Sequence, residues 1–308
     1  MAEFLDSAGE ERFLAKAVKF QLDLAPIEAS QSLYQGIMGA LGYSKNKLPF
    51  LELAHRLPLH VLESIAQDKI SDTECLARQQ ALLLGTAGLL PSQRQSNQRG
   101  NELDNKWIDK LERLWASSPH TKVMPPNTWH LFKVRPNNSP FRRLAAMSYL
   151  ILRYKKKGIF EELVNRVKEV PISQGYYRLE KVLAATTNGY RANHSDFGSV
   201  NKPRNQSLIG SRRAGDIIVN VLLPFTFAWS KVTAQPELER KAIDLYHHYP
   251  KLAVNSVERH MRNQFGLSSN LINSARRQQG LIHTYNTLCT QGRCDSCPLS
   301  QLEVGNHI

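Results

Sequence analysis

The chain has 308 residues and carries 40 Lys and Arg against 27 Asp and Glu, a formal net charge of +13. Its hydrophobic fraction of 42% and charged fraction of 22% exclude a disordered chain, and no segment approaches the roughly 20 apolar residues of a membrane span. With four cysteines and no signal-peptide pattern, we expect a cytoplasmic protein without a membrane segment. The oligomeric state is left open.

Apolar residues recur at helical spacing through the first 90 residues. Residues 11–24 carry an amphipathic stripe, a second helix follows Pro26 and stops at Gly42, and two short helices are expected to start at Pro49 and Pro58. Ser71 to Glu74 form a capping box and predict a helix that runs to residue 84. Residues 91–102 are polar and turn-forming, so we expect a mobile loop there.

The remaining chain also favours helices. Residues 103–115 are periodic, and a long helix is expected from Pro140 to Lys157. Residues 186–211 predict a second long loop, and the apolar run 217–229 predicts a buried helix that is kinked at Pro224. The last three expected helices span residues 236–248, 256–265 and 270–289.

These elements predict an all-α fold, a multi-helix orthogonal bundle with a C-terminal cysteine knuckle. The expected parts are an N-terminal helical subdomain at 1–90, the mobile loop at 91–102, a basic helical core at 103–285, and the knuckle and tail at 286–308.

Three of the four cysteines lie close together near the C-terminus. Cys289, Cys294 and Cys297 have C-x4-C-x2-C spacing, which lets thiolates turn toward one metal ion, and Arg293 favours their deprotonated form. We expect zinc, with an iron–sulfur cluster as the less favoured cofactor. His307 is the first choice for the fourth ligand. The alternatives are Cys75, His283, water or a partner's residue, and the thiols can also remain unliganded or form a redox pair.

Acidic residues are missing from two long stretches of the chain. None occurs between Glu112 and Glu161, and Glu258 is the only one from Leu245 to Cys294. Basic zones of this kind are typical of proteins that bind polyanions. Nucleic acid is the favoured partner, and an acidic protein is the alternative.

One basic segment combines polar side chains with an expected helix start. Asn137 and Asn138 come just before the helix that begins at Pro140, where helix N-termini with nearby arginines bind anions. Trp129 and Phe132 could add stacking surface. Alternatively, Ser139 only caps the helix and the aromatics belong to the core. The lysines that end the helix suit its dipole and extend the predicted anion-binding set: Arg135, Asn137, Asn138, Arg142, Arg143, Lys155, Lys156 and Lys157.

Motifs of known enzyme classes are missing from the sequence. It has no glycine-rich phosphate loop, no H-E-x-x-H and no serine elbow, and its basic zones have few carboxylates for a metal-dependent nuclease. We predict no catalytic residues. The favoured function is a non-catalytic module that binds nucleic acid or ribonucleoprotein. The alternatives are a scaffold that docks an acidic protein and an enzyme whose site has no recognisable motif.

Segments along nearly the whole chain resemble one bacterial family. Residues 48–59, 80–90, 135–143 and 216–231, together with Cys289, Cys294 and Cys297, are similar to the family catalogued as domain of unknown function 2851. Longer members carry an upstream region that looks like a PD-(D/E)xK nuclease domain. The resemblance implies that this chain begins after that region, so a nuclease-like domain would come from another chain or has been lost. The family usually has phenylalanine where Ser139 stands.

The cysteine segment also resembles the iron–sulfur loop of helix-hairpin-helix DNA glycosylases, in which a Cys-x-x-Cys-Pro-Leu run is common. That family needs a fourth cysteine where this chain has residues 301–304, and its Leu-Pro-Gly-Val-Gly hairpin is missing. An iron–sulfur DNA-repair-like protein is therefore a minor alternative.

Overall fold

A computed structural model describes residues 1–25, 28–67, 69–94, 102–118, 122–187, 194–197, 199–200 and 207–299. The chain forms two compact units. Unit 1 comprises residues 1–26, 166–180 and 215–308, and unit 2 comprises residues 27–165 and 181–214. Residues 95–101 of the expected loop at 91–102 lie outside the described residues, and Pro91–Gln93 at its start form a 3-10 turn. The all-α class is confirmed, because helices dominate the described residues and the strands are very short. Within those residues, no helix is long and apolar enough to cross a membrane.

Unit 1 is built from the two ends of the chain. Its helices are α1 (Ala2–Leu24), α11 (Leu223–Val232), α12 (Pro236–His247), α13 (Ser256–Gln264) and α14 (Ala275–Thr287), with a π-helix at Ile218–Leu222 and a 3-10 turn at Cys289–Gln291. Three more helices contribute residues to both units: α8 (Ile159–Glu169), α9 (Gly175–Leu183) and α10 (Ser211–Ile217).

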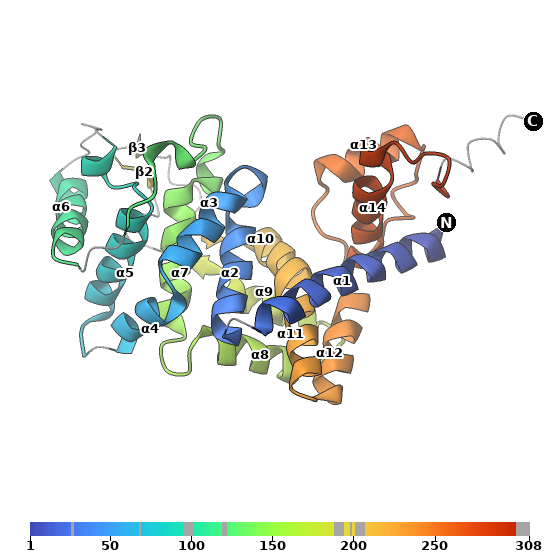
Figure 1. Cartoon of the computed structure of the whole chain (residues 1–308), viewed down its shortest axis with the longest axis horizontal. Coiled ribbons are helices and arrows are strands. Elements are labelled where there is room, and N and C mark those ends of the chain that lie inside the picture. The colour runs from blue at the N-terminus through green and yellow to red at the C-terminus, as the bar shows by residue number, and fades with distance from the viewer. Residues whose placement is uncertain are drawn as a thin grey trace, which may run out of the picture. The chain divides into compact units, whose positions relative to one another are not determined.

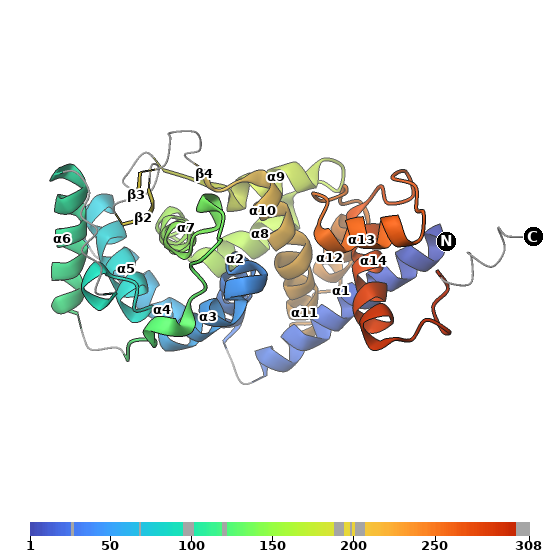
Figure 2. The same cartoon turned by 90° about the horizontal axis from the view of Figure 1, so that it is seen from above.

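The pairing of α1 with α14 forms the centre of unit 1. The two helices lie side by side in both views (Figure 1; Figure 2). Gly9 and Gly280 permit this approach, because a Cβ atom at Gly280 would lie 2.0 Å from the Leu5 carbonyl oxygen. Farther along α1, the buried Phe13 ring stacks on Tyr246 with ring centroids 4.6 Å apart. Sequence periodicity predicts a start of α1 at residue 11, but the helix begins at Ala2.

Unit 2 surrounds one buried helix. It contains α2 (Ala29–Leu41), α3 (Tyr43–Arg56), α4 (Leu59–Gln67), α5 (Asp72–Thr86), α6 (Glu102–Ala116) and α7 (Pro140–Arg153), and 3-10 turns at Pro91–Gln93, Pro126–Thr128 and Pro136–Asn138. The antiparallel pairs β1 (Ala185–Thr186) with β4 (Ser207–Ile209), and β2 (His194–Asp196) with β3 (Ser199–Val200), complete it. Contacts with α4, α5, β1, β2 and β4 surround α7, which Figure 2 shows nearly end-on.

Two helix starts illustrate where local signals succeed and fail. The predicted capping box is confirmed at Ser71, whose hydroxyl accepts a hydrogen bond from the Glu74 amide at 3.2 Å. Pro49, expected to start a helix, lies inside α3 instead. The backbone is non-helical at Asn46 (φ −113°, ψ 16°), so a new turn begins after this kink. Pro49 falls in that first turn, where a missing amide donor costs little.

Candidate anion-binding surface

The segment that contains three of the eight predicted anion-binding residues, Arg135, Asn137 and Asn138, forms a loop at 130–138 before α7. Trp129 fixes its start: the ring is 6% exposed, and its Nε1 donates to the Ala87 carbonyl at 2.7 Å. Trp129 also packs edge-on against Phe50 with centroids 5.3 Å apart. The Trp129 ring therefore belongs to the core and has no face free for a base, as the alternative interpretation of this residue expected.

Asn46 joins the loop to the beginning of α3. Its buried side chain donates to the His130 carbonyl at 2.9 Å and accepts from the His130 amide at 2.8 Å. Lys45 and Lys47 flank Asn46 and are exposed, as is Leu48, whose side chain is 76% exposed. Asn46 thus places two cations of α3 beside a loop that follows 84 residues later in the chain.

Phe132 is the most exposed large hydrophobic residue in the described part of the chain, at 78%. The Lys133 ammonium lies 5.1 Å from the centroid of its ring, and Lys133 adopts a left-handed backbone conformation (φ 52°). His130, Arg135 and Asn137 are exposed as well. Residues 43–48 and 130–138 contain no Asp or Glu, so the charged side chains that these two segments add near the Phe132 ring are cationic. We call these two segments the basic surface.

Arg143 lies beneath this surface rather than on it. Its guanidinium is 4% exposed and donates to the Leu208 carbonyl, to Asn138 Oδ1 at 3.0 Å and to the Tyr43 hydroxyl at 3.2 Å. No Asp or Glu of the described chain pairs with it. Burial lowers the pKa of Arg143 to about 10, so the side chain still carries a charge at neutral pH.

The buried Arg142 and the half-buried Arg213 lie in the same region as Arg143. Arg142 is 2% exposed and donates to the Ser207 carbonyl at 3.2 Å. Burial, and then the charge of Arg143, lowers the pKa of Arg142. The Arg213 guanidinium lies 3.0 Å from the centroid of the Tyr43 ring. The three arginines therefore hold β4, the start of α3 and the loop against α7, which is a positioning role.

The predicted lysines lie at the other end of α7. Lys155 pairs with Asp72 at 2.7 Å, and Lys156 and Lys157 are exposed in the turn after Arg153. Since a helix rises about 1.5 Å per residue, the 14 residues of α7 separate these lysines from Pro140 by about 20 Å. Of the predicted set, the structure gathers Arg135, Asn137 and Asn138 on the basic surface and places the three lysines apart from it.

Sequence reasoning missed Lys45, Lys47 and Leu48. No local pattern links them to the loop, because the link is the Asn46 side chain. An available signal was the run 43–48, which contains two lysines between the apolar end of α2 and the apolar residues 49–54.

The predicted metal ligands lie at the end of α14. Cys297 is buried with Leu5, Met261, Leu281 and other apolar side chains, Cys294 is exposed, and Cys289 Sγ lies 3.8 Å from Met261 Sδ. Burial, and then the nearby Cys297 and Cys294, raises the pKa of the Cys289 thiol, the opposite of the effect expected from Arg293. His307 lies outside the described residues.

The fit to a metal ion is incomplete. No three His, Cys, Asp or Glu side chains in the described ranges are arranged to hold one. The three thiols also differ in burial, since Cys297 is buried and Cys294 is exposed.

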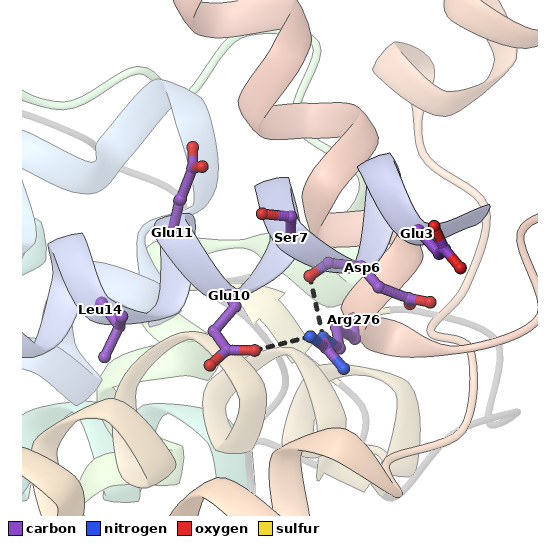
Figure 3. A pocket seen from close by; sticks show the side chains of 7 residues that line it. All are labelled: Glu3, Asp6, Ser7, Glu10, Glu11, Leu14 and Arg276. Carbon is purple, nitrogen blue, oxygen red and sulfur yellow. Dashed lines mark hydrogen bonds and ion pairs between the residues drawn. The ribbon is translucent and has the colours of Figure 1, made fainter. Parts of the chain in front are cut away.

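A hollow in unit 1 has the wrong charge for an anion. It has a volume of about 570 Å³ and is lined by Glu3, Asp6, Ser7, Glu10, Glu11, Leu14 and Arg276 (Figure 3). Arg276 points between Glu10 and the Asp6 carbonyl and donates to both, at 2.6 and 2.9 Å. Its charge is thereby neutralised within the hollow, which remains acidic.

Comparison with known proteins gives a family but no activity. A family model described as Protein of unknown function (DUF2851) matches residues 1–253. This range includes the basic surface and ends before α13, α14 and the three cysteines. No curated protein and no solved structure matches the chain.

Proposed function

This chain belongs to the family described as Protein of unknown function (DUF2851), and we propose that it is a non-catalytic module that binds nucleic acid, alone or in a ribonucleoprotein. The observation that supports this proposal is the 78% exposure of Phe132 among cations. A base stacks on an exposed aromatic ring while neighbouring cations bind the phosphates. An acidic protein would use the cations but gains less from the ring, so we expect a preference for single-stranded nucleic acid.

The chemistry of the basic surface supports binding rather than cleavage. Metal-dependent phosphodiester hydrolysis needs carboxylates to hold the metal ions, and residues 43–48 and 130–138 have none. Any cleavage would then require a nuclease-like domain on a partner chain. This partnership is a further part of the proposal.

Replacement of Arg135 and Lys133 by glutamine tests the binding function. We expect weaker binding of fluorescent single-stranded DNA and RNA, and a salt dependence that is flatter by about 0.7 log units for each cation–phosphate pair removed. Phe132→Ala should weaken binding and leave the salt slope unchanged, because stacking releases no counterions. Fluorescence anisotropy between 50 and 300 mM salt (roughly the range over which such pairs weaken) measures both quantities.

The matched control is Lys156→Gln with Lys157→Gln, which removes the same charge from the other end of α7 and should leave binding near that of the parent. Equally weakened binding in both double variants would show that binding follows net charge alone. If polyglutamate competes as well as an oligonucleotide and Phe132→Ala has no effect, the basic surface is instead a docking site for an acidic protein.

For the C-terminus we propose a zinc ion bound by Cys289, Cys294 and Cys297, whose side chains would have to turn toward one centre. Reduced protein that is purified without chelators should contain about one zinc per chain by elemental analysis. Cys294→Ser should lose the metal, whereas Cys75→Ser, at a buried position of α5, should retain it. Absence of both zinc and iron would refute the site, and a visible absorption band would indicate an iron–sulfur cluster.

A further inference from the structure

A second group of cations lies in unit 1, on residues other than those of the basic surface. Arg12 and Lys16 are one turn apart on α1, and both donate to the same oxygen, Gln279 Oε1 of α14. The distances are 2.9 Å from Arg12 Nε and 3.1 Å from Lys16 Nζ. Lys16 Nζ also donates to Asn220 Oδ1 at 2.5 Å.

The hydrogen-bond acceptor of Arg12 is a neutral amide. Elsewhere in unit 1, arginines meet carboxylates: Arg276 pairs with Glu10 at 2.6 Å and Arg277 with Asp6 at 3.1 Å. Arg12 has no carboxylate partner among the described residues, and burial lowers its pKa. Like charges one helical turn apart repel each other. Arg12 is partly buried and its hydrogen-bond partner in the described chain is a neutral oxygen, so it gains free energy when an anion binds beside it.

Asn220 is held in place by an unusual backbone. It lies in the π-helix at Ile218–Leu222. In an α-helix the Asn220 carbonyl would accept a hydrogen bond from the amide of residue 224, but Pro224 has no amide hydrogen. Its Nδ2 donates to the Asp216 carbonyl at 2.9 Å, which leaves Oδ1 directed at Lys16. Such π-helical turns occur frequently at functional sites.

The cluster is open to a ligand. Arg12, Lys16 and Asn220 are each partly exposed, and only Gln279 is buried. Arg12 uses Nε for Gln279, and its two Nη groups have no hydrogen-bond partner within the described chain. These groups provide the paired donors that suit a tetrahedral oxyanion, and Lys16 adds a point charge.

We propose that Arg12, Lys16, Gln279 and Asn220 form a binding site for a phosphate group. The group comes either from free inorganic phosphate or from a nucleic acid, since both present the same oxygens. The Arg12 Nη groups bind two of these oxygens and Lys16 a third. Gln279 of α14 accepts hydrogen bonds from both Arg12 and Lys16 and so keeps these two side chains of α1 close together.

Titration of the full chain with inorganic phosphate, at constant ionic strength kept by sodium chloride, tests the site. We expect saturable binding by calorimetry. Arg12→Gln should weaken it about ten- to hundredfold, the usual value of a hydrogen bond to a charged group. Arg12→Lys, which keeps the charge but not the paired donors, should have an intermediate effect. Lys19→Gln removes an exposed cation from the same helix and should bind phosphate like the parent.

If a variant folds poorly, the titration of His283 in the parent protein gives a second measurement of phosphate binding. It lies on α14 with Nε2 3.5 Å from Glu11. Its pKa is lowered by burial first and also by Arg12 and Lys16, while Glu11 raises it. Bound phosphate offsets the two cations, so the His283 resonance should titrate at higher pH when phosphate is present. No saturable binding, an unchanged His283 titration, or equal affinity in Arg12→Gln and the parent would each overturn the site.

The source of the phosphate group is resolved by competition. If a short oligonucleotide displaces inorganic phosphate from the parent, and Arg12→Gln weakens its binding, the site takes a nucleic acid phosphate. If the oligonucleotide leaves phosphate in place, the site takes the free ion. A failure of the Phe132 and Arg135 experiments would leave this outcome untouched, because those residues belong to unit 2.

Discussion

At the scale of single residues, burial separates two kinds of arginine in the segment 135–143. Arg135 is exposed and has no side-chain partner in the described structure, whereas Arg142 and Arg143 donate to main-chain carbonyls from the interior of unit 2. The sequence predicts a cationic segment at a helix start and cannot separate these roles. The difference depends on β4, which follows about 65 residues later.

Because Arg143 is buried and supports the loop, we can predict the effect of Arg143→Met. The substitution removes the donors to Leu208, Asn138 and Tyr43, so we expect the free energy of unfolding to fall by about 1 to 3 kcal/mol. Nucleic acid binding should weaken because the loop loses its support. Its salt slope should stay that of the parent, since every cation that faces a phosphate is retained.

Denaturant unfolding and anisotropy at several salt concentrations measure these effects, with Arg135→Gln as the contrasting variant. A flatter salt slope in a stably folded Arg143→Met protein would show that Arg143 touches phosphate directly, as the sequence pattern predicts.

At the scale of elements, sequence signals place helices well and their ends less well. The Ser71 cap is local, and its prediction is confirmed. The last helix is expected from residue 270 but begins at Ala275, after Ser274, whose side chain accepts from the Arg277 amide at 3.2 Å. The kink expected at Pro224 is realised as a π-helix that ends at Leu222. The residues that meet across elements are not predictable, because Asn46 and Gln279 act on partners far away in the sequence.

The close approach of α1 and α14 at Gly9 and Gly280 predicts that a larger residue at Gly280 destabilises the protein. In Gly280→Ala, the new Cβ would lie 2.0 Å from the Leu5 oxygen and 3.0 Å from the Gly9 amide, so the helices must move apart. We expect the free energy of unfolding to fall by about 1 to 3 kcal/mol, together with weaker phosphate binding because Gln279 moves away from Arg12.

Gly210→Ala is the control for the substitution itself, since among the described residues its Cβ would meet only Ser207 Oγ, at 3.4 Å. Thermal unfolding that is equal in the two variants would show that α1 and α14 have room for the methyl group.

At the scale of the whole molecule, the fold class is accessible from the sequence and the composition of the two units is not. Helical periodicity is local, and it identifies an all-α chain. Unit 1 joins the first 26 residues to the last 94, which a search for linkers along the chain does not reveal.

The purified chain should not cleave DNA or RNA in the presence of magnesium or manganese, because its basic surface has no carboxylates to hold the metal. Gel assays with single- and double-stranded substrates measure this. Cleavage that persists through stringent purification and disappears on substitution of one Asp or Glu of this chain would reveal a catalytic site.

The partnership of α1 with α14 also has a consequence for synthesis on the ribosome. The apolar face of α1, with Leu5 and Phe13, is translated first, but its partner at Gly280 follows about 270 residues later. At typical elongation rates of about 5 to 20 residues per second, the apolar face of α1 stays exposed for on the order of 10 to 50 s before α14 has been translated. Throughout this interval the nascent chain displays a ready binding site for a chaperone.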